Sequence, residues 1–454
     1  MFRNNYTIFF VLLATTLSLG SCKKWVDVQA PLQVDQNEVF STQEGFKEVL
    51  NGVYLQMGNQ STYGRDLNLG LLSVLGRSYD TTISPAIGNL FYQGARYNFQ
   101  DADVRATTKN IWDGLYFSIG NLNNLLSNVD SRQKVFTDTN YNTIKGEALG
   151  LRAYLHFDLL RLFAPSPAAS GLNTPAIPYV TKTSPYASPV ATTGAVIDSC
   201  IADLLNAQSL LSTTDITTSR FTIWAAKGLL ARIYLYKGDL VNAQKYALEI
   251  INSKKFSLAT TNSDLMFTKE HLFSIFSSIN SAISYNSSVL NTNPPLGFTT
   301  ANQTALFVAG SGAATDWRRA LAFVDPVSGL TSGNTISPRK FYSNNQSSVN
   351  IVPMIRTTEM YYIAAEVANA LKDSLSATTL LDTVRVHRNL LKYTQVALKR
   401  DSINIEISKE YQKEFLGEGQ VFYYYKRKNL PFASLPYTKV PVIPNASYVF
   451  IKPE

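Results

Sequence analysis

The sequence predicts a mainly α-helical protein built from stacked helical hairpins, because residues 222–252 read as two amphipathic helices around a Lys-Gly-Asp turn. Apolar residues recur there three or four positions apart, as in one buried stripe per helix: Trp224, Leu229, Ala231, Ile233, Tyr234, Leu240, Ala243, Ala247, Leu248 and Ile251. Gly238 can end the first helix in a left-handed conformation, and Asp239 can cap the second.

The order of small and aromatic residues in this hairpin is close to the tetratricopeptide signature: Ala231, Tyr234, Gly238, Ala243 and Ala247. Such a hairpin cannot cover its own apolar faces, so neighbouring hairpins are expected in the same chain. The fold class predicted is therefore a tetratricopeptide-like scaffold. The simpler alternative is an isolated helical hairpin in an ordinary α protein.

Composition allows a large core and argues against a nucleic-acid partner. Of 454 residues, 45% are hydrophobic and only 16% are charged, which argues against disorder. The net charge of +8 comes from scattered basic residues whose densest run, 426–428, is typical of a solvated helix end. Abundant Tyr and Phe beside Asn, Ser and Thr suit neutral polar ligands.

The N-terminus reads as a targeting segment. Arg3 precedes an apolar run at 8–19, and Leu19-Gly20-Ser21-Cys22 resembles a bacterial lipobox. We expect a signal peptide over 1–21 and an acylated Cys22 that anchors a soluble domain to a membrane, since each buried acyl CH₂ contributes about 0.8 kcal/mol. The alternative is an ordinary secretory signal with a chance cysteine. No later segment reaches the roughly 18 apolar residues that a membrane span needs.

Helical periodicity continues along the first half of the chain. Ser41 and Glu44 form a capping-box pattern that predicts a helix start. Residues 58–100 show no strong period and predict loops with short helices. Long helices are expected at 104–128, 141–163 and 193–211, the second of them stopped by Pro165 and Pro167.

The amino-acid composition changes in the second half of the chain. Ser, Thr, Asn and Gly dominate residues 254–353, and a structureless loop of this length inside a compact domain is improbable. An irregular, loop-rich subdomain inserted between helical repeats is therefore expected. Helices are predicted to resume at Ile355 and to cover 374–388 and 401–416. An aromatic cluster at 422–425 and a proline-containing, extended tail follow.

Several stretches, in order along the chain, resemble the SusD/RagB family of Bacteroidetes outer-membrane lipoproteins. They are Arg-Ala-Tyr-Leu-His-Phe-Asp-Leu-Leu-Arg-Leu-Phe at 152–163, the hairpin at 224–251, Met-Ile-Arg-Thr-Thr-Glu-Met-Tyr at 354–361, Leu-Leu-Asp-Thr-Val-Arg at 380–385, and the segment 406–419 with Glu-Phe-Leu-Gly-Glu-Gly. The resemblance implies one SusD-like domain over 22–454. Its helical repeats would lie at about 41–253 and 354–430, and its ligand-facing insertion at about 254–353.

The resemblance implies a non-catalytic lipoprotein of the outer membrane, facing the exterior. Such a protein would bind oligosaccharide or peptide nutrients and pass them to a SusC-like TonB-dependent transporter, without a cofactor. Aromatic rings from irregular regions can stack on such ligands, and the candidates are Tyr63, Tyr79, Tyr92, Trp317 and Tyr342. The alternative for each ring is that it only packs its own loop.

Motifs for catalysis and metal binding are missing from the sequence. Its three histidines do not pair at metal-ligating spacing, and neither a nucleophile elbow nor a phosphate-binding Gly loop occurs. Glu410 and Glu414 share a helix face, where structural ion pairs with nearby Arg and Lys are expected. Two other functions stay open: a helical-repeat interaction scaffold in the cell envelope, and a hydrolase with two carboxylates about 5–10 Å apart across a cleft.

Overall fold

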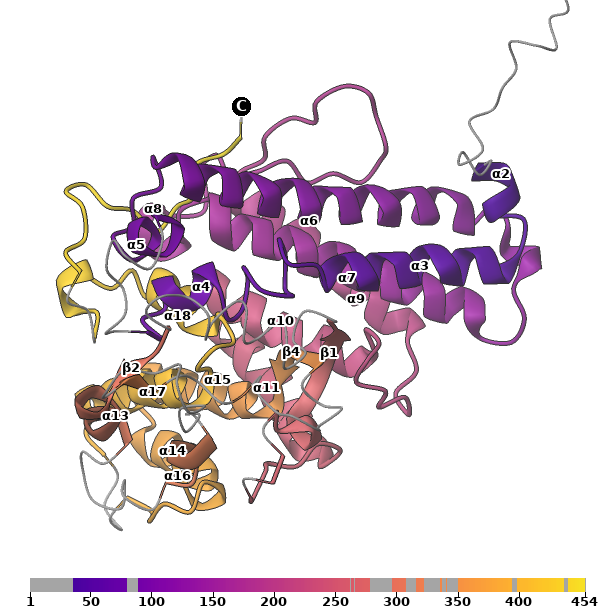
Figure 1. Cartoon of the computed structure of the whole chain (residues 1–454). Coiled ribbons are helices and arrows are strands. Elements are labelled where there is room, and N and C mark those ends of the chain that lie inside the picture. Colours follow the sequence, from indigo (N-terminus) through magenta and orange to yellow (C-terminus); the bar gives the residue numbers. More distant parts are fainter. Residues whose placement is uncertain are drawn as a thin grey trace, which may run out of the picture.

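Four long helices lie side by side and form the N-terminal half of the fold (Figure 1). They are α3 (Gln43–Met57), α6 (Ala102–Val129), α7 (Asn140–Phe163) and α9 (Thr193–Leu210). This computed structural model describes residues 36–79, 89–261, 263–264, 266–277, 296–307, 316–321, 335–336, 340, 350–393, 398–436 and 440–453. Short elements flank the long helices: α2 (Gln36–Val39), α4 (Leu71–Leu75), α5 (Asn89–Ala95), a 3₁₀ turn at Gln133–Val135, and α8 (Pro167–Ser170).

The predicted hairpin follows as α10 (Ile223–Lys237) and α11 (Leu240–Ser253). Gly238 ends α10 with φ +89°, a left-handed conformation that costs glycine little. The Asp239 carboxylate accepts a hydrogen bond from the Asn242 amide at 3.1 Å and caps α11. Both terminal signals expected at this turn are confirmed.

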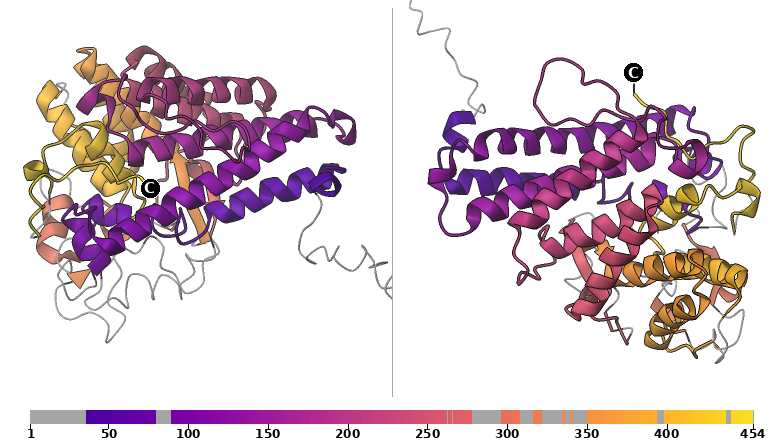
Figure 2. Two further views of the ribbon diagram at one scale, coloured as in Figure 1. Left: turned by 90° about the horizontal axis from the view of Figure 1, so that it is seen from above. Right: turned by 180° about the vertical axis from the view of Figure 1, so that it is seen from behind.

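Successive helices pack on one another through the whole molecule. Helix α7 contacts α6 and α9, α9 contacts α10, α11 contacts α15 (Thr357–Ala370), and α15 contacts α16 (Ser374–His387). In Figures 1 and 2 the long N-terminal helices lie on one side of this stack and α15, α16 and α17 (Arg400–Glu414) on the other. The mainly α, tetratricopeptide-like fold is confirmed.

Helix α7 is the axis of the N-terminal half, because it is buried nearly all around from Gly146 to Phe163. A buried helix must pair its polar side chains. Glu147 accepts from the Tyr54 hydroxyl at 2.6 Å, and Arg152 makes two 2.7 Å contacts with Asp203. These pairs tie α7 to α3 and α9.

Two short antiparallel sheets occur among the described residues, and neither was predicted. Strand β1 (His271–Phe276) pairs with β4 (Ile351–Arg356), and β2 (Phe298–Thr299) pairs with β3 (Thr335–Ile336). The expected helix start at Ile355 is wrong, because β4 continues to Arg356, which is extended (φ −121°, ψ 149°) and precedes α15. The remaining described elements of this region are a 3₁₀ turn at Thr268–Glu270, α13 (Thr300–Phe307) and α14 (Arg318–Leu321).

One local prediction, the capping residue of α3, needs correction. The cap of α3 is Thr42, whose extended backbone lets its hydroxyl accept from the Gly45 amide at 3.2 Å, whereas the Ser41 hydroxyl donates to the Glu38 carbonyl. The aromatic cluster at 422–425 belongs to a helix, α18 (Gln420–Arg427), followed by a 3₁₀ turn at Phe432–Ser434. Among the helices described, none combines the length and apolarity that crossing a membrane requires.

Candidate functional site

Trp317 is a partly exposed aromatic side chain whose position is held from several sides, and we refer to it with Phe267 as the Trp317 platform. Its indole Nε1 donates to the His387 carbonyl at 2.9 Å. The Phe267 ring meets it edge to face at 5.5 Å between centroids, and the Arg388 guanidinium lies 5.2 Å from its ring centre. A ring fixed in this way can stack on a ligand with little loss of side-chain entropy.

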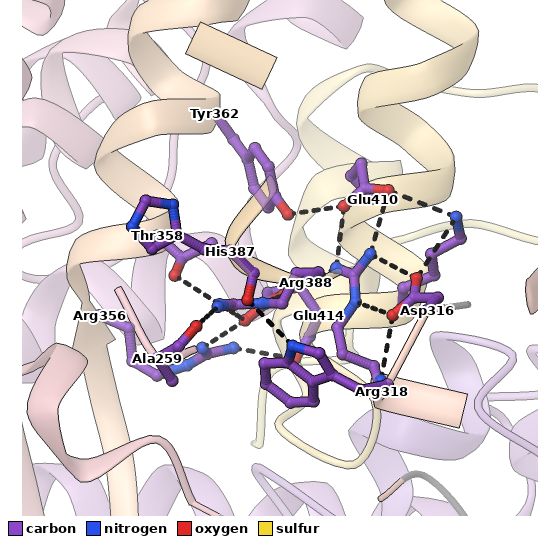
Figure 3. Close-up of polar contacts among 12 residues, drawn as sticks. Ala259, Asp316, Arg318, Arg356, Thr358, Tyr362, His387, Arg388, Glu410 and Glu414 are labelled. Carbon is purple, nitrogen blue, oxygen red and sulfur yellow. Dashed lines mark hydrogen bonds and ion pairs between the residues drawn. The ribbon is translucent and has the colours of Figure 1, made fainter. Parts of the chain in front are cut away.

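A buried network of charges lies against this platform (Figure 3). Arg388 Nη2 lies 2.7 Å from both Glu270 and Glu414, and its Nη1 donates to the Ala259 carbonyl at 2.8 Å. Arg318, the residue after Trp317, contacts Asp316, Glu410 and Glu414, each at 2.8 Å. The tryptophan therefore stands between Asp316 and Arg318, which bind each other and α17.

The carboxylates of this network are held in their ionised form. Burial alone would raise the pKa of Glu414, but the guanidinium groups of Arg388, Arg356 and Arg318 keep it well below its usual range. Burial likewise opposes the ionisation of Glu410, yet Arg318 and Lys413 lower its pKa to about 2. Ion pairs thus hold α17 and the end of α16 against the turn that precedes β1 and against the Trp317 segment.

The expected structural role of Glu410 and Glu414 is confirmed, because both are buried and both are ion-paired. Sequence reasoning did not identify Phe267 or Arg388 as part of the site. Phe267 has a backbone φ of +55°, which is rare for a bulky residue, and the cationic groups of Lys340, Arg356 and Arg388 lie 4.9–5.2 Å from its ring centre. The residues around Phe267 in the sequence show no pattern that would predict this environment.

Two of the predicted ligand contacts lie in the core. Tyr63 is 4% exposed, and its hydroxyl donates to Asp158 of α7 at 2.7 Å. Tyr79 is 2% exposed, and its hydroxyl donates to the Leu69 carbonyl at 2.6 Å. Neither ring is accessible to a ligand in this structure, and neither lies with Trp317 in one site.

The other predicted positions differ among themselves. Tyr92 on α5 is partly exposed, and the Arg96 guanidinium lies 5.4 Å from its ring centre. It packs against a small cluster that contains Tyr79 and Phe91. Tyr342 and the lipidation candidate Cys22 lie outside the described residues.

Away from the Trp317 platform, a small cavity lies between α7, α10 and α18, but it is too small to hold a nutrient molecule. Its volume is about 30 Å³, and Arg161, Arg232, Tyr236 and Tyr423 are among the residues that line it. This volume holds one or two water molecules. Groups of carboxylates, histidines or cysteines arranged to hold a metal ion are not found in the part of the chain that the structure describes.

Comparisons with known proteins agree with this architecture. Residues 24–235 match a family of SusD-like proteins described as starch-binding and associating with the outer membrane, and residues 327–435 match the SusD family. SusD-like protein P2 of Formosa agariphila is 27% identical over 237 residues, which are 50% of this chain and 42% of that protein. The match thus spans less than half of that relative's length.

Solved structures share the fold. A SusD superfamily protein from Bacteroides thetaiotaomicron superimposes with a TM-score of 0.72 at 23% identity, covering 86% of this chain and 89% of the other. A SusD-like carbohydrate binding protein from Bacteroides vulgatus gives 0.69 at 18% identity, covering 85% and 83%. The two family matches lie before and after β1 in the sequence, and the solved structures share the same stack of helices. The chain belongs to the SusD/RagB family.

Proposed function

We propose that this protein is a non-catalytic outer-membrane lipoprotein that binds oligosaccharide and delivers it to a SusC-like TonB-dependent transporter. Two kinds of observation support the proposal. Family members associate with the outer membrane, and related proteins are described as starch-binding or carbohydrate-binding. The rigid, partly exposed Trp317 provides the stacking surface that a sugar ring requires.

The proposal rests mainly on Trp317, because its side chain is both partly exposed and held in one position. An indole held by Phe267, Arg388 and the His387 carbonyl is already oriented before a ligand arrives. Preorganisation of this kind lowers the entropic cost of binding. Tyr92 is the second proposed contact, since its ring is partly exposed.

Calorimetric titration against a panel of oligosaccharides tests this function. Trp317→Ala should weaken binding by about 2 kcal/mol, roughly a 30-fold loss of affinity. Trp317→Phe keeps a ring but loses the hydrogen bond to His387, so a smaller loss is expected. Tyr186→Ala is the matched control, because Tyr186 is 83% exposed on a loop and should leave the affinity unchanged.

A parallel titration against peptides separates the two ligand classes. If peptides bind and sugars do not, the ligand is a peptide and not an oligosaccharide. If neither binds, a nutrient-binding role is contradicted. Co-purification with envelope assembly proteins instead of a transporter would favour the scaffold function. Incorporation of labelled palmitate into the wild type, but not into Cys22→Ser, tests the proposed lipid anchor.

A further inference from the structure

A pocket of about 420 Å³ lies between α8, the segment after α18 and the C-terminal tail. Helix α8 is far in the sequence from the other two segments, but all three lie side by side at one end of the long helices, where the tail is coloured yellow (Figures 1 and 2). The volume is within the range of small-molecule sites. Its lining includes Ser166, Ala169, Lys426, Asn429, Phe432 and Tyr448, and none of these residues belongs to the Trp317 platform.

One part of this C-terminal pocket is aromatic. The rings of Phe432 and Tyr448 stack with centroids 4.5 Å apart and an interplanar angle of 20°. Tyr97 meets the Phe432 ring edge to face at 4.7 Å, and the Tyr448 hydroxyl donates to the Leu430 carbonyl at 2.8 Å. The partly exposed Phe432 ring is therefore fixed by Tyr448 and Tyr97, and it gives the pocket a flat apolar surface of the kind that sugar rings contact.

Lys426 gives the pocket a buried amino group that lacks a carboxylate partner, and burial together with the nearby Arg161 guanidinium lowers the pKa of this group well below its usual value. The residue is 1% exposed, and its ammonium donates to the Leu162 carbonyl at 3.0 Å, at the C-terminal end of α7. Within the described residues it makes no ion pair with a carboxylate, and Arg161 is the charged group that acts on it. Arg318, by contrast, contacts three carboxylates, as expected for a buried charge.

Ser166 adds a second group that lacks a partner. Its side chain is 2% exposed, and its hydroxyl has no hydrogen-bond partner among the described residues. A buried hydroxyl without a partner leaves a desolvation cost uncompensated, and a buried amine without an anion holds its proton less tightly. An acceptor with negative charge, entering the pocket, would satisfy both groups.

We propose that the C-terminal pocket binds an acidic sugar unit, with its ring against Phe432 and its carboxylate toward Lys426 and Ser166. The site is separate from the Trp317 platform and does not depend on it. A carboxylate could also belong to a small acid without a sugar ring, so the sugar and the carboxylate must be tested separately.

The probes are D-glucuronate, D-glucose and acetate, with binding measured by calorimetry or ligand-observed NMR on the full mature protein. Glucuronate should bind at least tenfold more tightly than glucose and than acetate. Lys426→Met should lower the affinity for glucuronate at least tenfold while leaving that for glucose unchanged. Trp317→Ala should not change glucuronate binding, which distinguishes this site from the proposed oligosaccharide site.

Ala169→Trp is the decisive variant, because Ala169 is an exposed lining residue whose enlargement fills the pocket without disturbing the core. It should abolish glucuronate binding. Ala168→Trp is its matched control, since Ala168 is exposed on the same short helix but does not line the pocket. Equal binding of glucose or acetate, no binding of glucuronate to the wild type, or full binding by Ala169→Trp would overturn the proposal, even if Lys426→Met fails to fold.

Discussion

Arg356 binds both the side chain and the main chain of Glu414. Its Nη1 lies 2.7 Å from Glu414 Oε1, and its Nη2 donates to the Glu414 carbonyl at 2.8 Å. Arg356 ends β4 and Glu414 ends α17, so one guanidinium neutralises a carboxylate and also satisfies a C-terminal helix carbonyl. Strand β4 and helix α17 are therefore joined by a buried ion pair, next to the charged residues that contact Trp317.

Loss of the Glu414 charge should destabilise the protein strongly. Glu414→Gln keeps the shape but leaves Arg318, Arg356 and Arg388 with fewer counter-ions in a buried site, at a cost of about 3–5 kcal/mol. Urea unfolding measures the change. Glu406→Gln on the same helix is the control, because its ion pair with Lys409 is more exposed and should contribute less than about 1 kcal/mol. Similar losses in the two variants would contradict a structural role for the buried network.

The pair of Glu366 and Arg427 predicts a loss of stability in acid. Burial alone would raise the pKa of Glu366, but Arg427, with contacts of 2.7 and 2.8 Å, and Lys428 lower it to about 2. Because the folded pKa lies below the unfolded value near 4.5, the pair stabilises the fold above pH 4.5. This contribution, on the order of 3 kcal/mol, is lost as the pH falls toward 2.

Glu366→Gln should flatten the dependence of unfolding free energy on pH between 4.5 and 2. Glu249→Gln is the matched control, since its ion pair with Lys227 is more exposed to solvent. If Glu366→Gln shows the same dependence of unfolding free energy on pH as the wild type, the acid sensitivity comes from other carboxylates.

His156 predicts a second loss at milder pH. Burial lowers its pKa to about 3, while its Nδ1 contacts the Arg152 carbonyl and its Nε2 accepts from the Val180 amide, both at 2.9 Å. The ring is therefore neutral, with its proton on Nδ1. Since the folded pKa lies below the unfolded value near 6.5, the unfolded chain takes up the proton first, and stability falls as the pH drops below 6.5.

The expected loss through His156 from pH 7 to pH 5 is about 2 kcal/mol. Urea unfolding at the two pH values measures it. His156→Gln has no titrating ring and should show a smaller difference between the two pH values, whatever its stability at pH 7. Equal differences for wild type and variant would mean that His156 is not the sensor. An NMR signal assigned to the His156 imidazole that titrates near pH 6.5 would also contradict its burial.

Most helices were predictable because their period is local. The stripe in α10 and α11, Gly238 and Asp239 lie within one short stretch and specify the turn without help from elsewhere. Strand β4 was not predictable, because it contains Pro353 and its partner β1 lies far back in the chain, with Phe276 opposite Ile351. Both strands are buried along nearly their whole length, so neither shows the alternation of apolar and polar residues that marks a half-buried strand.

The candidate site was predictable only by residue type. Trp317 was identified as an aromatic in an irregular region, but its support comes from Arg388, which binds Glu270 and Glu414 at 118 and 26 positions along the chain from it. Tyr63 had the same sequence signal and yet lies in the core, because its hydroxyl pairs with Asp158, 95 positions away. A single sequence cannot distinguish these two environments.

Two glycines on helices of the same bundle should respond in opposite ways to alanine. A Cβ at Gly150 of α7 would lie 2.1 Å from the ring of Phe221, which is itself buried and packed against Phe273 at 5.3 Å. The ring cannot move aside freely, so Gly150→Ala should cost about 1–3 kcal/mol through overpacking. A Cβ at Gly52, on the exposed face of α3, would meet nothing within 4 Å.

Gly52→Ala should therefore stabilise the protein by roughly 0.5–1 kcal/mol, the difference in helix propensity between the two residues. Thermal and urea unfolding of both variants measure the two signs. Because both substitutions add one methyl group to the middle of a helix, propensity alone predicts a gain at each. A gain at Gly150 would show that α7 and the 221 segment do not approach as closely as the structure requires, and the packing around the central helix would have to be revised.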